Sequence, residues 1–217
     1  MIAYNKTLMF LCKHTIMKVI AISGYKGGCG KSMTSIHIAR FFADYGAVLL
    51  IDSDPNRSCE NWFNRSPIQV PFSVVNEKAA SRQIPGKDFL ILDTPARPAS
   101  SELKEISEGA DLTILPCIPD AFSVQAMFSM LPDLSPQAVY RCLLTVCPPA
   151  PSKEATQIRE ALEEAGVPLL RSQIRRAAGF TKAIAQGLAV CDLSAKDRMG
   201  WLDYQGVGKE MCEILGV

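Results

Sequence analysis

A glycine-rich segment between an apolar run and a helical pattern constrains the fold more than any other part of this chain. Residues Ser23 to Ser32 read S-G-Y-K-G-G-C-G-K-S and follow the apolar run Val19 to Ile22. Glycines allow successive backbone N–H groups to converge on an anion without interference from Cβ atoms. A helix that begins directly after them adds its own N–H groups and its dipole. This order predicts a phosphate-binding loop; a glycine-rich turn that only happens to carry lysines is the alternative.

The side chains of this loop have separate expected roles. Lys31 can reach the β- and γ-phosphates of a nucleotide, and the Ser32 hydroxyl suits Mg²⁺. Tyr25 stands where the strict G-x-x-x-x-G-K-[ST] pattern has its first glycine, and a second lysine, Lys26, opens the glycine run. Cys29 is expected to contribute its backbone N–H, with an oxidation-sensitive thiol as the alternative. The predicted nucleotide-binding residues are Gly27, Gly28, Cys29, Gly30, Lys31, Ser32 and Met33.

Two further apolar runs end in carboxylates. Val48 to Ile51 is followed by Asp52, and Phe89 to Leu92 is followed by Asp93. Short, continuous apolar runs are typical of strands buried in a parallel sheet. Ligands of open α/β sheets bind at the carboxyl ends of such strands. We therefore expect both carboxylates to meet the glycine-rich loop in one crevice.

Three ordered motifs resemble those of the ParA/MinD family of ATPases. K-G-G-C-G-K-S is similar to the deviant Walker A box, in which the extra lysine is the signature residue. L-L-I-D-S-D-P-N-R-S resembles the second box of the family, and F-L-I-L-D-T-P resembles its Walker B strand and switch region. The resemblance covers residues 18–193 and is greatest for short ParA-type ATPases, of the plasmid ParA or carboxysome-positioning McdA type. It implies a P-loop NTPase fold, with a mostly parallel twisted sheet flanked by helices, and the cofactors ATP and Mg²⁺.

The resemblance also implies roles for single residues. The catalytic set is Lys26, Lys31 and Asp54: Asp54 would orient or activate the attacking water, and Lys26 would cross a dimer interface to the phosphates bound in the other subunit. Ser32, Asp52 and Asp93 would hold Mg²⁺, partly through water. The alternative for Asp52 is a strand-end cap or turn former. For Lys26, the alternative is a solvated loop charge.

The rest of the chain fits one compact α/β domain of 217 residues. We assign residues 17–217 to this domain and residues 1–16 to a leader outside its core. Strands are predicted at 18–23, 48–52, 72–75, 89–93, 112–118, 140–147 and 167–171, and helices at 31–45, 101–109, 122–131 and 153–165. Eight cysteines without a C-x-x-C spacing indicate a reducing cytoplasm.

Charge is distributed unevenly, although the net charge is only +1. Residues 171–198 hold six basic and two acidic residues, a net charge of +4. Positioned Lys and Arg side chains suit sequence-independent contact with DNA phosphates, and the resemblance implies that this region binds nonspecific DNA. An ordinary solvated face is the alternative. The predicted DNA-binding residues are Arg171, Arg175, Arg176 and Lys182.

These features lead to one functional expectation. The resemblance implies an ATPase that forms a homodimer on ATP, binds nucleoid DNA in the cytoplasm and positions a cargo with a ParB-like or McdB-like adaptor protein. The main alternative is a MinD-like membrane-associated ATPase, which needs a basic amphipathic helix at the C-terminus; we expect no membrane partner. A metabolic relative, such as a nitrogenase-type iron protein or a dethiobiotin synthetase, and a tyrosine autokinase are further alternatives. The sequence does not identify the cargo.

Overall fold

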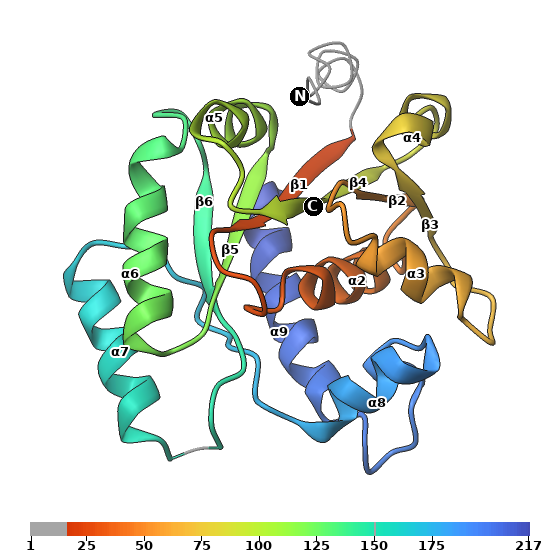
Figure 1. Ribbon diagram of the computed structural model, residues 1–217. Helices are drawn as coiled ribbons and strands as arrows, with labels where there is room; N and C mark the ends of the chain where they lie inside the picture. The colour runs from red at the N-terminus through yellow and green to blue at the C-terminus, as the bar shows by residue number, and fades with distance from the viewer. Residues whose placement is uncertain (1–16, 150) are drawn as a thin grey trace.

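The chain folds around a twisted, all-parallel sheet of six strands with helices on both faces (Figure 1). The computed structural model describes residues 17–149 and 151–217; the predicted leader, residues 1–16, lies outside them. Neighbouring strands follow the order β3-β2-β4-β1-β5-β6. The strands are β1 (Lys18–Gly24), β2 (Val48–Asp52), β3 (Ser73–Asn76), β4 (Phe89–Ala96), β5 (Leu112–Cys117) and β6 (Tyr140–Leu144).

The helices cover the two faces unequally. Residues of α2, α8 and α9 share the largest apolar cluster with one face of the sheet, and residues of α4 and α5 form a second cluster with the opposite face. The helices are α2 (Lys31–Phe42), α3 (Ser58–Asn64), α4 (Glu77–Gln83), α5 (Ser100–Gly109), α6 (Ala121–Met130), α7 (Lys153–Glu164), α8 (Ala178–Gln186) and α9 (Gly200–Leu215), with short 3₁₀ turns at Leu131–Asp133 and Val190–Asp192.

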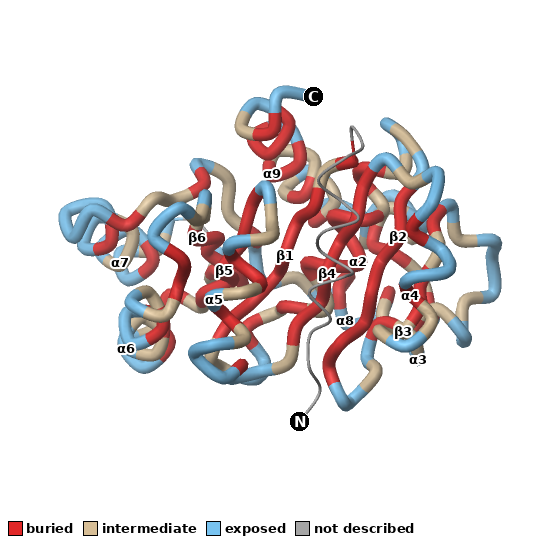
Figure 2. Tube along the Cα trace, turned by 90° about the horizontal axis from the view of Figure 1, so that it is seen from above, coloured by how far each residue is buried: buried red, intermediate tan, exposed pale blue. Residues whose placement is uncertain are grey.

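The central strands are buried on both faces, as their continuous apolar sequences predict. Ile20 and Ile22 of β1 pack into the cluster of α2, whereas Val19 and Ala21 pack into the cluster of α4 and α5. Figure 2 shows the sheet as a buried layer, with the exposed residues on the outer helix surfaces and loops. This two-sided burial fixes the register, because a slip of one residue would exchange the two faces.

The strand register brings the two predicted carboxylates side by side. Asp52 pairs with Asp93 across β2 and β4, and Asp93 pairs with Ile22 of β1. All three strands end at the same edge because the sheet is parallel. The glycine-rich loop therefore leaves β1 at the same edge of the sheet as both carboxylates, as the sequence predicts.

The predicted strand at 167–171 is wrong. Only Leu169 forms a bridge, to Cys142 of β6. The backbone N–H groups of Arg171 and Ser172, which would extend the ladder, instead donate to the carboxylate of Glu210 on α9 at 2.7 Å each. Four helices, α3, α4, α8 and α9, lie outside the predicted helical ranges.

Helix α9 packs its apolar side into the protein. Tyr204, Val207, Met211 and Leu215 are buried in the main cluster, and Gly208 lets the Phe41 ring approach so closely that a Cβ atom would lie 2.4 Å from it. Among the described residues, no helix has the length and apolar character needed to cross a bilayer. Because the apolar face of α9 is already occupied, the MinD-like reading is not favoured.

Candidate nucleotide-binding site

The loop between β1 and α2 has the geometry of an anion cradle. Gly28 and Gly30 have φ angles of +80° and +88°, a left-handed conformation that side-chain-bearing residues rarely adopt. The Thr145 hydroxyl, directly after β6, donates to the carbonyl of Cys29 at 2.8 Å and fixes the centre of the loop. Helix α2 begins at Lys31 with no side chain capping its first N–H groups. Those groups remain available to an anion.

The two lysines of the loop point to different places. Lys31 is buried, and its Nζ lies 3.5 Å from the carbonyl oxygen of Lys26. The Lys26 ammonium instead donates to the Ser123 hydroxyl at 2.8 Å and lies 3.4 Å from Asp120 Oδ1, at the start of α6. Tyr25 donates to Asp133, in the turn after α6, at 2.6 Å. Consecutive loop residues therefore hold both ends of α6.

The Cys29 side chain is buried and donates to the carbonyl of Lys26 at 3.1 Å. Burial raises the pKa of this thiol, which disfavours the reactive thiolate. This geometry supports the expectation that Cys29 contributes its backbone N–H, and it weighs against the oxidation-sensitive alternative.

Asp93 is fully buried with only neutral donors around its carboxylate. Ser35 donates to Oδ1 at 2.7 Å and the Cys59 thiol lies 3.3 Å from Oδ2. Burial raises the pKa of Asp93 to about 6. No Lys, Arg or His nitrogen in residues 17–149 and 151–217 pairs with it. A buried carboxylate without a cationic partner is unfavourable unless a cation binds there.

Asp52 and Asp54 differ in how far their oxygens are already used. The Asp52 carboxylate accepts from the backbone N–H groups of Cys59 at 2.9 Å, Glu60 at 3.0 Å and Asp54 at 3.2 Å. It therefore caps the start of α3, which agrees with the strand-end cap foreseen as the alternative for this residue. Asp54 is buried, and among the described residues its carboxylate accepts only from the N–H of Asn56, at 2.8 Å.

These residues fit ATP and Mg²⁺. Ser32 lies in the first turn of α2, and the contact of Ser35 with the Asp93 carboxylate holds that turn against the end of β4. Among the described residues, no group of three His, Cys, Asp or Glu side chains gathers as a protein-only metal cage. One carboxylate and one hydroxyl are the small donor set with which Mg²⁺ binds nucleotide phosphates. Ser32 and Asp93 would hold this ion, with Asp52 behind them.

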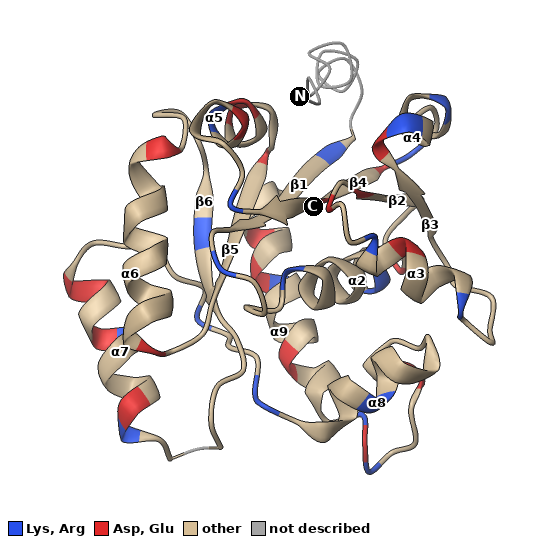
Figure 3. Ribbon diagram, viewed as in Figure 1, with Lys and Arg blue, Asp and Glu red and all other residues tan. Residues whose placement is uncertain are grey.

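The predicted DNA-binding residues are all exposed, but most are paired with acidic residues. Arg175 donates to Asp203 at 2.7 and 2.8 Å, Arg171 lies 2.8 Å from Glu213, and Lys182 lies 2.8 Å from Asp197. Arg176 is exposed, and no carboxylate lies within 4 Å of it in the described part of the chain. Figure 3 shows the acidic residues of α9 beside this basic segment. Residues 171–217 together carry a net charge of +2, with seven basic and five acidic residues.

Several residues that shape the site were not predicted. Ser35 follows Lys31 by four positions, so helical periodicity could have placed it on the same face as the loop. Cys59, Asp120 and Ser123 carry no comparable signal. Each meets its partner across a sequence separation of 34 to 97 residues. Such contacts depend on the packing of whole elements.

Comparisons with known proteins agree with this geometry. Residues 20–190 match the family described as the CobQ/CobB/MinD/ParA nucleotide binding domain. The chain is 28% identical over 202 residues to the maintenance of carboxysome distribution protein A of Gloeobacter kilaueensis, covering 89% of this chain and 94% of that protein. It is also 28% identical over 170 residues to the protein ParA of Rhizobium radiobacter, covering 71% and 76%.

Solved structures share the fold. A complex of a Cyanothece McdA variant with ATP matches with a TM-score of 0.72 at 14% identity, covering 94% of this chain and 98% of that chain. A putative plasmid partition protein from Borrelia burgdorferi bound to AMPPNP matches with a TM-score of 0.71 at 17% identity, covering 91% and 99%.

Proposed function

Because this chain belongs to the CobQ/CobB/MinD/ParA nucleotide-binding family, we propose that it is a Mg²⁺-dependent ATPase that dimerises on ATP and positions a cargo. The similar proteins named for carboxysome distribution and for partition support a role in distributing a protein organelle or segregating a replicon. On this proposal the dimer binds nonspecific DNA of the nucleoid in the cytoplasm. A ParB-like or McdB-like adaptor stimulates hydrolysis and releases the dimer.

The observation that carries the proposal is the different direction of the two loop lysines. Lys31 lies buried against its own loop, where it can neutralise phosphates bound in the same subunit. Lys26 reaches the start of α6 instead. Its ammonium group therefore does not point toward the phosphate position of its own glycine-rich loop. A dimer that encloses two nucleotides would concentrate negative charge between its subunits. A lysine from each partner would favour the ATP-bound dimer by differential contact.

The remaining residues have distinct parts in this proposal. Gly27, Gly28, Cys29, Gly30, Ser32 and Met33 bind the nucleotide by backbone and side-chain groups. Asp54, whose carboxylate accepts one hydrogen bond from the described part of the chain, orients the attacking water. Positioning of the water and stabilisation of charge account for most of the rate enhancement in phosphoryl transfer.

The test uses two variants with opposite expected defects. Asp54→Ala should bind ATP and dimerise but lose hydrolysis, because the phosphate cradle remains while water orientation is lost. Lys26→Ala should bind ATP as a monomer. ATPase assays and size-exclusion chromatography with a non-hydrolysable analogue distinguish them. A Lys26→Ala protein that dimerises like the wild type would leave this lysine as a solvated loop charge and contradict the proposal.

DNA binding is tested separately. A dimer would present two basic segments, which raises affinity through effective concentration and steepens the dependence on salt. Duplex DNA of any sequence should therefore bind with ATP and not with ADP, and binding should weaken as salt rises. Equal affinity in both nucleotide states would contradict the nucleoid role.

A further inference from the structure

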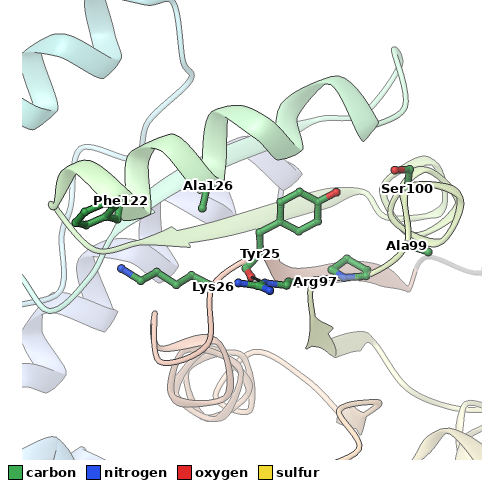
Figure 4. A pocket seen from close by; sticks show the side chains of 8 residues that line it. Tyr25, Lys26, Arg97, Ala99, Ser100, Phe122 and Ala126 are labelled. Carbon is green, nitrogen blue, oxygen red and sulfur yellow. Dashed lines mark hydrogen bonds between the residues drawn. The ribbon is translucent and has the colours of Figure 1, made fainter.

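A cavity of about 510 Å³ lies between the loop after β1, the loop after β4 and the start of α6 (Figure 4). Its walls include two aromatic side chains, Tyr25 and Phe122, and two cations, Lys26 and Arg97. The lining includes neither Lys31 nor the glycines of the cradle. The cavity therefore lies beside the nucleotide site of this subunit, not within it.

Arg97 occupies an unusual place in this wall. It follows the Walker B carboxylate Asp93 by four positions and has a φ angle of 55°, in the left-handed region where non-glycine residues are strained. Its backbone N–H donates to the carbonyl of Gly24 at 3.4 Å, and its Nε donates to the carbonyl of Tyr25 at 3.3 Å. The residue is thus tied to the loop directly before Lys26.

The strained conformation is not explained by an ion pair. Arg57, which is also left-handed, donates to both carboxylate oxygens of Glu77. No carboxylate lies within 4 Å of Arg97 in the described part of the chain, and within its side chain only Nε has a hydrogen-bond partner there. The terminal nitrogens of its guanidinium are available, and their planar fork matches phosphate oxygens.

Arg97 also decides the charge of the cavity. The charge of Lys26 is matched by Asp120 at 3.4 Å, so the pair contributes no net charge. Arg97 supplies the remaining positive charge and leaves the cavity suited to an anion. A phosphate group held by a second copy of this chain would approach Lys26 and Arg97 through this cavity and not through the glycine-rich loop of their own subunit.

We propose that Arg97 is a second phosphate-binding cation that acts across the ATP dimer, beside Lys26. This inference rests on the proposed function, because it requires two subunits that face each other through bound nucleotide. Arg97 contacts the phosphates held by the partner subunit. Its attachment to the Tyr25 carbonyl makes its position depend on the loop that binds its own nucleotide, which couples the two sites.

The decisive variant is Arg97→Gly, since glycine accepts the left-handed backbone while the guanidinium is removed. We expect nucleotide affinity of the monomer, measured at low protein concentration with a fluorescent analogue, to stay within about twofold of wild type. The dissociation constant of the ATP-analogue dimer, measured by sedimentation, should rise by about tenfold or more, the scale of one lost charge-assisted contact. Arg97→Lys should fall between, because it keeps the charge but loses the fork.

Arg82→Ala, at an exposed arginine on α4 outside the cavity, is the matched control and should dimerise like wild type. An Arg97→Gly protein with wild-type dimerisation overturns the inference and leaves the proposed function intact. An Arg97→Gly protein that instead loses monomer nucleotide affinity also overturns it, because Arg97 would then only support the loop. A wild-type protein that fails to dimerise with the ATP analogue overturns both.

Discussion

The nucleotide-site edge of the sheet and the basic segment at 171–198 differ in how their charges are matched. At the edge, Asp93 is buried among neutral donors, and Lys31 contacts a carbonyl oxygen. In the basic segment, Arg175 and Lys182 each pair with a carboxylate at 2.7 to 2.8 Å. The first region holds a buried carboxylate without a cationic partner among the described residues. In the second, three of the six basic residues already pair with a carboxylate: Arg171, Arg175 and Lys182.

The difference teaches which charges indicate a ligand. A buried charge without a partner is costly to fold around and so points to something that binds there. Exposed ion pairs contribute only about 0–1 kcal/mol and are common on protein surfaces. A run of basic residues in the sequence is therefore a weaker sign of a binding surface than a single buried carboxylate whose neighbours are all neutral.

The two regions are also physically connected. His37 of α2 accepts from the backbone N–H of Val190 at 3.0 Å and stacks on Tyr204 of α9 with ring centroids 4.6 Å apart. The Tyr204 hydroxyl lies 3.2 Å from Thr34 Oγ1. Helix α2, which starts at the nucleotide site, thus packs against the C-terminal segment and α9. Contiguous side-chain contacts therefore connect the two regions.

The largest expected effect is on ATP affinity, and it distinguishes the buried Lys31 of the loop from the exposed Lys182 of the basic segment. Lys31→Ala should weaken ATP binding by about 1,000-fold, about 4 kcal/mol, because it removes a buried cation from the phosphates. Lys182→Ala, which breaks an exposed pair with Asp197, should leave ATP affinity unchanged. Isothermal titration calorimetry with a non-hydrolysable analogue measures both. Similar losses of ATP affinity in the two variants would contradict the proposed difference between the two regions.

The next effect tests the connection through His37. Burial lowers the pKa of His37 to about 4, from 6.5. The unfolded chain therefore binds a proton between pH 6.5 and 4 that the folded chain does not bind. The contribution of His37 to stability is complete above pH 6.5 and is lost as pH falls toward 4, by about 3 kcal/mol.

Urea unfolding at several pH values in this window measures the effect of His37. The free energy of unfolding of His37→Gln should depend less on pH than that of wild type, because the titrating imidazole is gone and both proteins share the other ionisable groups. Parallel curves for the two proteins would show that His37 is not held neutral, and the proposed link between α2 and the C-terminal helices would lose its main support.

The smallest expected effects distinguish paired from unpaired arginines within the basic segment. Arg175→Glu leaves the nearly buried Asp203 without its partner and should cost about 2 kcal/mol, a fall in Tm of about 4–8 °C. Arg176→Glu, at an arginine without a carboxylate partner among the described residues, should change stability by less than about 0.5 kcal/mol. If this face binds DNA, Arg176→Glu should still weaken binding severalfold on any sequence and reduce the salt slope.

Thermal unfolding and fluorescence anisotropy with duplex DNA separate the two variants. An Arg176→Glu protein with unchanged DNA affinity would favour the ordinary solvated face. An Arg175→Glu protein with an unchanged Tm would show that its pairing with Asp203 adds little to stability.

Local sequence was enough to predict the loop and the strands that carry the two carboxylates, although β4 continues three residues past its predicted end, to Ala96. The glycines at 28 and 30 have the positive φ angles that their positions require. Asp52 ends β2 and pairs with Asp93, which lies three residues before the end of β4. The loop conformation follows from a short strand–loop–helix segment, and the apolar runs predict the strands; their pairing across β2 and β4 was expected from the parallel-sheet rule for such runs. The family match at residues 20–190 agrees with the same motifs.

Only the tertiary structure decided which charges are free. Lys26 meets Asp120 across 94 residues, and Arg175 meets Asp203 across 28. The segment at 167–171 does not continue as a strand because Glu210, on the distant helix α9, accepts the N–H groups of Arg171 and Ser172. The sequence by itself located the glycine-rich loop and its left-handed glycines, because backbone geometry is local. The partners of each charged side chain depend on how whole helices pack, and packing brings together residues that no local pattern connects.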